Sequence, residues 1–127
     1  MKVKLSIAAL VLAATCLYAA DEKNVTLEGT LVSSSCYTGG PDHPMGNDMG
    51  GKKGCGSFCL RHGDPAGLVT KSKEFHVLIV SSLKLAPYVG QQVRITGEEF
   101  NGSIAVRKAE VAEGDNWKEV NLRSNNQ

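Results

Sequence analysis

The sequence lacks the short motifs that mark the commonest classes of enzyme active site. It contains no G-x-S-x-G nucleophile turn, no H-E-x-x-H zinc motif and no G-x-x-x-x-G-K-[ST] phosphate loop. Each of these patterns holds catalytic groups in a geometry that its chemistry requires. The chain also has no repeat of fixed period and no low-complexity tail, so a repeat architecture is not expected. These absences favour one small domain that is not an enzyme.

No apolar run in the sequence reaches the roughly 20 residues of a comfortable membrane span. The uncharged stretch 5–20 follows two lysines, Lys2 and Lys4, and is followed by the polar residues 21–23. A basic start, a short apolar centre and an exit of small residues are typical of a secretory signal peptide. We therefore expect residues 1–20 to be a signal peptide, the mature chain to be periplasmic or secreted, and no membrane attachment after cleavage.

An excess of positive charge is also missing. The sequence has 14 basic and 13 acidic residues. Without Lys2 and Lys4 the expected mature chain has 12 and 13, which gives a formal charge of −1. Binding to nucleic acid requires cationic side chains that displace counterions from phosphates. The composition therefore argues against nucleic acid as a partner and leaves a small ligand or an envelope protein.

Five segments have the composition and alternation of β-strands: residues 25–31, 66–70, 74–80, 92–100 and 103–111. In the fourth we expect Val93 and Ile95 to point inward, and an Asn-Gly turn at 101–102 predicts a hairpin with the fifth. The segment 74–80 is apolar on both faces and is expected to lie centrally. Gly29 in the first predicts a bulge or a sharp bend.

Two segments have the features of short helices. Residues 55–62 suit two helical turns, with Gly63 as the C-terminal cap. Residues 81–90 suit a turn or helix, with a serine placed to cap it. Together with the strands, these elements predict a mainly β fold: a small five- to six-stranded OB-like barrel with one or two short helices and a glycine-rich cysteine loop. We assign the barrel to residues 21–112, the loop to 38–56 and a polar C-terminal tail to 113–127.

Residues 85–97 read LAPYVGQQVRITG, a helical turn that ends in glycine followed by a strand of the V-x-V-x-G type. This segment resembles small secreted bacterial OB-fold-like proteins, and residues 27–32 are similar to their first strand. The Cys36-Tyr37 pair with Cys55-x3-Cys59 resembles a cysteine-bearing subgroup of these exported proteins. The resemblance covers most of residues 25–111. It implies a periplasmic or extracellular binding module and supplies no catalytic residues.

Three cysteines remain once Cys16 is removed with the signal peptide: Cys36, Cys55 and Cys59. An odd number in an oxidising compartment cannot pair completely within one chain. Cys55 and Cys59 are four residues apart on the expected helix, so their Cβ atoms would lie roughly 5–6 Å apart, whereas a disulfide requires about 3.5–4.5 Å. Cys36 could bond to either and leave one thiol free.

The alternative interpretation uses all three cysteines as ligands of a metal ion. His62 would share a helix face with Cys55 and Cys59, and Cys36 could reach that face from the end of the first strand. Three thiolates and one imidazole suit zinc, and thiolates also suit copper(I). The loop contains further candidate ligands, namely His43, Met45 and Met49. His76, in the third strand, is expected to be a hydrogen-bonded core or surface residue.

The functional prediction is an exported, non-enzymatic binding module whose Cys/His loop is stabilised by a disulfide or by bound zinc or copper. One alternative is a periplasmic thiol redox protein or sensor, although the C-x-x-C pattern of most reactive pairs is absent. Another is a structural envelope protein that forms a disulfide-linked dimer through its odd cysteine. The sequence leaves these three open. The aromatic residues are expected in the core rather than on a binding surface: Tyr37, Phe58, Phe75, Tyr88, Phe100 and Trp117.

Overall fold

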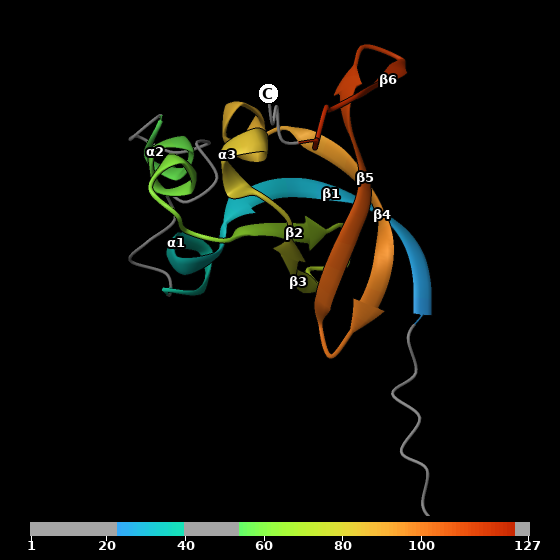
Figure 1. The fold of residues 1–127 in the computed structure, drawn as a ribbon, viewed down its shortest axis with the longest axis horizontal. Coiled ribbons are helices and arrows are strands. Elements are labelled where there is room, and N and C mark those ends of the chain that lie inside the picture. The colour runs from blue at the N-terminus through green and yellow to red at the C-terminus, as the bar shows by residue number, and fades with distance from the viewer. Residues whose placement is uncertain (1–22, 40–53, 124–127) are drawn as a thin grey trace, which may run out of the picture.

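The computed structural model describes residues 23–39 and 54–123. The expected signal peptide, most of the expected glycine-rich loop and the last four residues lie outside this part of the chain. The described residues form a mainly β fold, as the sequence predicts, with short helices at one end of a barrel (Figure 1). No helix among the described residues is both long enough and apolar enough to cross a membrane.

The expected elements are present in the expected order with small changes in their bounds. The strands are β1 (Lys23–Ser33), β2 (Ala66–Thr70), β3 (Phe75–Ile79), β4 (Gln92–Phe100), β5 (Ser103–Glu113) and β6 (Asn116–Glu119). The helices are α1 (Ser34–Thr38), α2 (Cys55–Arg61), α3 (Ser82–Leu85) and the 3-10 helix η1 (Ala86–Tyr88). Two of these elements, α1 and β6, were not predicted. Ser81 lies at the N-cap of α3 as expected, although its side chain makes no capping hydrogen bond.

Five of the strands close into a barrel. The sheet order is β3-β2-β1-β4-β5-β6, and a further pairing joins β3 to β5. That closing pair is parallel, whereas the other neighbours are antiparallel. The helical segment α3–η1 lies between β3 and β4 in the chain. The closed five-stranded barrel with one added strand confirms the predicted OB-like architecture.

The core fills the barrel with aliphatic side chains from every barrel strand. Val93 and Ile95 are buried as the alternation predicts, because side chains along a strand point to opposite faces. The Asn-Gly turn joins β4 to β5, and Asn101 and Gly102 have φ angles of 49° and 78°. Both values are positive, as a type I′ hairpin turn requires.

Gly29 marks a close approach of strands rather than a bulge. It pairs with Val93 on β4 and with Thr70 on β2, and a Cβ atom there would lie 2.2 Å from the Val69 carbonyl oxygen. The register shift of the sheet lies instead between Thr96 and Gly97. Only glycine permits such a close approach of backbone to backbone.

β3 pairs with β2 on one side and β5 on the other, so it lies centrally in the sheet as predicted. Its two apolar faces are not both buried, because Leu78 is buried while the neighbouring Ile79 is 59% exposed. The expectation that the aromatic residues lie in the core is wrong for three of them. Tyr37, Phe58 and Phe100 are exposed instead of lying in the core. The barrel interior is filled by aliphatic residues, and these aromatic side chains lie on the helices or at a strand end outside it.

Part of the segment after β5 is attached to the barrel through Trp117 and Val120. β6 pairs antiparallel with the end of β5, and the guanidinium carbon of Arg94 lies 4.2 Å from the ring centroid of Trp117. Val120 follows β6, is 6% exposed and belongs to the hydrophobic core. A cation–π contact and one buried aliphatic side chain therefore fix this part of the chain to the barrel.

Candidate metal centre

The three cysteines meet at one end of the barrel, in the connection between β1 and β2. Cys36 lies on α1, which directly follows β1, and Cys55 and Cys59 lie on α2, which precedes β2. Figure 1 shows both helices at the same end of the molecule, away from β6. The topology thus brings together residues that are 23 positions apart in sequence.

The sulfur atoms of Cys36, Cys55 and Cys59 all lie within 4.8 Å of one another. The Sγ atoms of Cys36 and Cys59 are 3.8 Å apart and form a hydrogen bond. A disulfide has a sulfur–sulfur distance of about 2.05 Å, and all three cysteines are free thiols. Three sulfurs held about 2.3 Å from a zinc ion at tetrahedral angles would lie roughly 3.8 Å apart. The cluster therefore has the spacing of a thiolate metal site.

The Asp64 carboxylate fixes the helix that carries Cys36. Its Oδ2 accepts hydrogen bonds from the Ser33 hydroxyl and, at 3.3 Å, from the backbone N–H of Ser35, while Oδ1 accepts one from the Ser35 hydroxyl at 2.5 Å. Ser33 is the N-cap of α1. The first N–H groups of a helix have no partner within it, so Asp64 supplies the cap from a distant part of the chain.

The end of α2 places Asp64 where it can do this. The Gly63 N–H donates to the Leu60 carbonyl at 3.3 Å, and the Asp64 N–H donates to the Cys59 carbonyl at 3.0 Å. Gly63 has a φ of 98°. These two bonds and the left-handed glycine form a Schellman motif, which confirms Gly63 in its predicted capping role. The turn directs the chain from α2 towards the start of α1.

α2 is attached to the barrel by Leu60, which is 1% exposed and belongs to the hydrophobic core. The helix packs against β1, α3 and η1. α1 is held on its other side by Tyr37, whose ring stacks on Phe75 of β3 at a centroid distance of 5.3 Å. Phe75 has room because it lies against Gly67, where a Cβ atom would come within 2.5 Å of its ring. Both cysteine-bearing helices are therefore packed on the barrel.

The pKa of the Cys59 thiol is raised from 9.0 to about 11, and burial is the largest cause. The hydrogen bond with Cys36 and the negative charges that Cys36, Cys55 and Asp64 can carry contribute the rest of this increase. Each factor disfavours the thiolate, because an anion is poorly solvated there and lies beside other anions. A bound cation would reverse this effect, since a coordinating thiol is deprotonated outright.

The structure does not bring His62 into the cysteine cluster. Its Nδ1 donates to the Phe58 carbonyl oxygen at 2.8 Å, and its ring stacks on Phe58 at a centroid distance of 4.0 Å. Only Nε2 would remain to bind a metal. The group within mutual reach consists of the three cysteines alone among the described residues. The other candidate ligands, His43, Met45 and Met49, lie outside the described part of the chain.

His76 differs from the sequence-based expectation. It pairs with Leu68 across the β2–β3 ladder, and directly opposed residues share a face of the sheet, so it faces the side of the buried Leu68. Both ring nitrogens are buried and have no hydrogen-bond partner among the described residues. Polar groups in a core are usually paired, and neither nitrogen of His76 is paired with another described residue.

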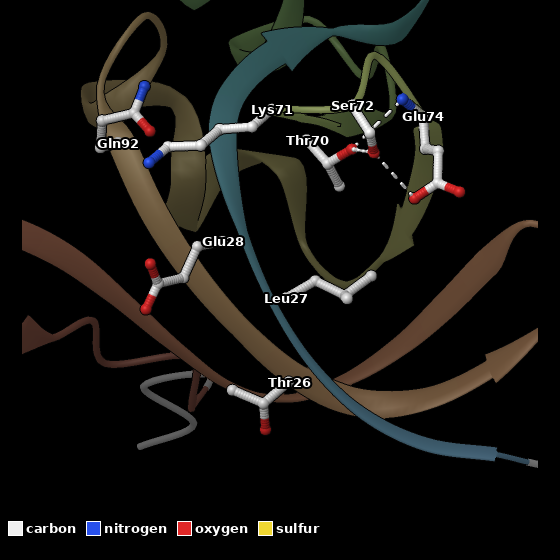
Figure 2. A pocket seen from close by; sticks show the side chains of 8 residues that line it. All are labelled: Thr26, Leu27, Glu28, Thr70, Lys71, Ser72, Glu74 and Gln92. Atoms are coloured by element: carbon white, nitrogen blue, oxygen red, sulfur yellow. Dashed lines mark hydrogen bonds between the residues drawn. The ribbon is translucent and has the colours of Figure 1, made fainter.

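A hollow lies on the barrel wall, away from the cysteines. It has a volume of about 370 Å³ and is formed by β1, the start of β4 and the β2–β3 turn (Figure 2). Polar groups of the turn bond to one another, from Thr70 to Ser72 at 3.0 Å and from Ser72 to Glu74 at 3.2 Å. The lining contains no cysteine or histidine: Thr26, Leu27, Glu28, Thr70, Lys71, Ser72, Glu74 and Gln92. The three cysteine sulfurs that could hold a metal ion lie elsewhere, at the helical end of the barrel.

Sequence reasoning identified the three cysteines but missed two groups that position them. Asp64 stands directly after the capping glycine, and the run Ser33-Ser34-Ser35 before Cys36 consists of residues that favour helix N-termini. That run was the available signal for α1. No family model, curated protein or solved structure matches this chain.

Proposed function

We propose that this chain is an exported, non-enzymatic module that binds a soft metal ion, copper(I) or zinc, through Cys36, Cys55 and Cys59. The observation that carries the proposal is the convergence of three sulfur atoms within 4.8 Å of one another from two separate helices. Thiolates select copper(I) and zinc over harder cations such as magnesium or calcium. The OB-like barrel serves as the rigid support of this site.

The donor set distinguishes the two metals. Structural zinc sites have four ligands, so zinc would need a fourth donor besides the three sulfurs. Copper(I) is satisfied by soft thiolates alone. In both cases the ion binds thiolates, so that binding releases protons and weakens as the pH falls. This proton release is large for Cys59, whose pKa is raised to about 11.

A structural disulfide is less well supported as the main role of the cluster. It would occupy two of the sulfurs and leave the third without a function, although all three point to one place. The contact between Cys36 and Cys59 is 3.8 Å, close to the roughly 3.8 Å expected for two thiolates on one zinc ion.

The test is a metal titration of the reduced chain carrying Cys16→Ser, so that Cys36, Cys55 and Cys59 are its only thiols. Copper(I) is supplied from a chromophoric chelator that competes for it, and cobalt(II) is used as a spectroscopic substitute for zinc. We expect one equivalent to bind per chain with sulfur-to-metal charge-transfer absorption. Cys55→Ser should weaken binding by about 100-fold or more, since the effect of losing a ligand exceeds the 10–100-fold effect of losing an outer-shell partner.

His62→Ala is the matched control, because His62 lies beside the cluster on the same stretch of chain but outside the sulfur group. A three-sulfur site predicts unchanged copper(I) affinity in this variant. Equal losses in His62→Ala and Cys55→Ser would show a four-ligand Cys3His site instead. Failure of the reduced chain to bind either metal more tightly than a chain with all cysteines replaced by serine would overturn the proposal.

A further inference from the structure

The three sulfurs are close together but are not equivalent as partners for one another. Cys36 and Cys59 make the direct sulfur contact at 3.8 Å and come from different helices. Cys55 and Cys59 lie one turn apart on α2, where Cβ atoms are roughly 5–6 Å apart and a disulfide needs about 3.5–4.5 Å. A bond between these two would require α2 to unwind.

The link through Asp64 selects Cys59 over Cys55 as the partner of Cys36. The Asp64 backbone N–H bonds to the carbonyl of Cys59, and its carboxylate bonds to the backbone N–H of Ser35, the residue before Cys36. This short hydrogen-bonded chain holds the C-terminal end of α2 against α1. Cys59 is near that end, whereas Cys55 is the first residue of the helix.

Only a small movement separates the sulfur contact from a covalent bond. The two sulfurs must approach by about 1.8 Å to reach a disulfide length of about 2.05 Å. Rotation of the two side chains between staggered positions about their Cα–Cβ bonds moves the sulfur atoms over distances of this size.

Resting on the metal-binding function proposed above, we infer that Cys36 and Cys59 form a reversible disulfide that switches the metal site off, whereas Cys55 acts only as a metal ligand. Metal binding and the disulfide compete for the same two sulfur atoms. In the oxidised state only the sulfur of Cys55 remains available as a ligand, and one sulfur does not hold an ion that three hold together.

The oxidant is a low-molecular-weight disulfide such as glutathione disulfide. One sulfur of the pair, as thiolate, attacks a sulfur of glutathione disulfide, so that a mixed disulfide forms and one glutathione thiolate leaves. The other sulfur of the pair loses its proton and attacks the protein sulfur of this mixed disulfide, and the second glutathione thiolate leaves. The protein loses two electrons and two protons, and two molecules of glutathione are formed.

The experiment equilibrates the metal-free chain carrying Cys16→Ser in buffers of glutathione and glutathione disulfide. Free thiols are then blocked, the disulfide is located by non-reducing peptide mapping with mass spectrometry, and copper(I) capacity is measured on the same samples. We expect one Cys36–Cys59 bond per monomer, with loss of two hydrogens. The amount of copper(I) bound should fall from one ion per chain to none on oxidation. Reduction with dithiothreitol should restore it.

Two variants separate the roles of the cysteines. Cys55→Ser should form the same disulfide at the same glutathione ratio as the parent while binding metal poorly. Cys36→Ser should form no intramolecular disulfide. A dominant Cys36–Cys55 bond, a dominant intermolecular dimer or full metal capacity in the oxidised chain would each overturn the inference and leave the metal site standing. If the reduced chain binds no metal at all, the proposed function fails and the switch fails with it.

Discussion

At the scale of single residues, the site depends on the burial of one thiol and on the acidic groups around it. Cys59 is partly buried by the packing of α2, and it lies beside Cys36, Cys55 and Asp64, each of which can carry a negative charge. Its pKa is therefore raised to about 11. Without a metal ion the folded protein holds this group as a neutral thiol, and with a metal ion the same crowding of sulfurs becomes favourable.

This shift predicts how the stability of the metal-free, reduced protein depends on pH. The folded state holds the proton of Cys59 more tightly than the unfolded chain, whose thiol has a pKa near 9.0. The stabilisation is fully present below pH 9.0 and is lost as the pH rises through the window from 9.0 to about 11, because the unfolded state then binds fewer protons. Urea unfolding at a series of pH values measures the effect.

Cys59→Ser provides the reference for that measurement, since lysines, tyrosines and the other thiols titrate in the same range. The parent chain should lose more unfolding free energy than the variant across the window. Parallel curves for the two proteins would show that Cys59 has an ordinary pKa.

At the scale of secondary-structure elements, α1 is too short to be stable alone. It has five residues, far below the roughly 12–15 that an isolated helix needs in water. Tertiary contacts hold it: the Asp64 carboxylate at its N-terminus and the Tyr37–Phe75 stack on its side. The position of Cys36 is thus decided by groups outside its own helix.

Asp64→Ala is expected to lower the free energy of unfolding by about 1–2 kcal/mol, the usual effect of losing a helix cap. It should also weaken metal binding, because α1 and Cys36 lose their connection to the end of α2. Chemical denaturation and the copper(I) competition titration give the two readouts. Asp115→Ala is the control, since Asp115 is an exposed acid in the β5–β6 turn. Equal effects of both substitutions would count against the capping role.

At the scale of the whole molecule, the barrel and the site share one buried core. Leu60 comes from α2, one residue after Cys59, and packs with side chains of the barrel strands. On β4, Arg94 forms an ion pair with Glu28 at 2.9 Å and a cation–π contact with Trp117. Each of these exposed contacts contributes little to the free energy of unfolding. Burial of aliphatic surface is what joins the cysteine helices to the barrel.

Leu60→Ala should therefore lower the free energy of unfolding by about 2–5 kcal/mol, as for other large-to-small changes in a core. Leu83→Ala is a matched control on a neighbouring helix, because Leu83 is 61% exposed and should change stability by no more than about 0.5 kcal/mol. Denaturant unfolding followed by Trp117 fluorescence compares the two. A small effect of Leu60→Ala would show that α2 is not part of the cooperative unit.

Local patterns were sufficient to predict the parts of the fold that depend on neighbours in sequence. The β4–β5 hairpin follows from Asn101-Gly102, since few other dipeptides accept positive φ at both positions. The inward Val93 and Ile95 follow from the two-residue period of a strand. The end of α2 follows from Gly63. The exposure of Ile79 and Phe58 could not be predicted, because many apolar side chains lie on protein surfaces. Whether one is buried depends on which other elements pack against it.

The sequence alone predicts the mainly β composition, the hairpin, the helix of Cys55 and Cys59, and cysteines 36, 55 and 59 as candidate ligands. Alternation, turn chemistry and helical spacing are local properties, and the number of cysteines is a property of composition. Only the tertiary structure decided that Cys36 meets Cys59, that Asp64 holds them together and that His62 turns to Phe58. The physical reason is that these contacts join separate elements, whose relative placement depends on barrel closure and core packing.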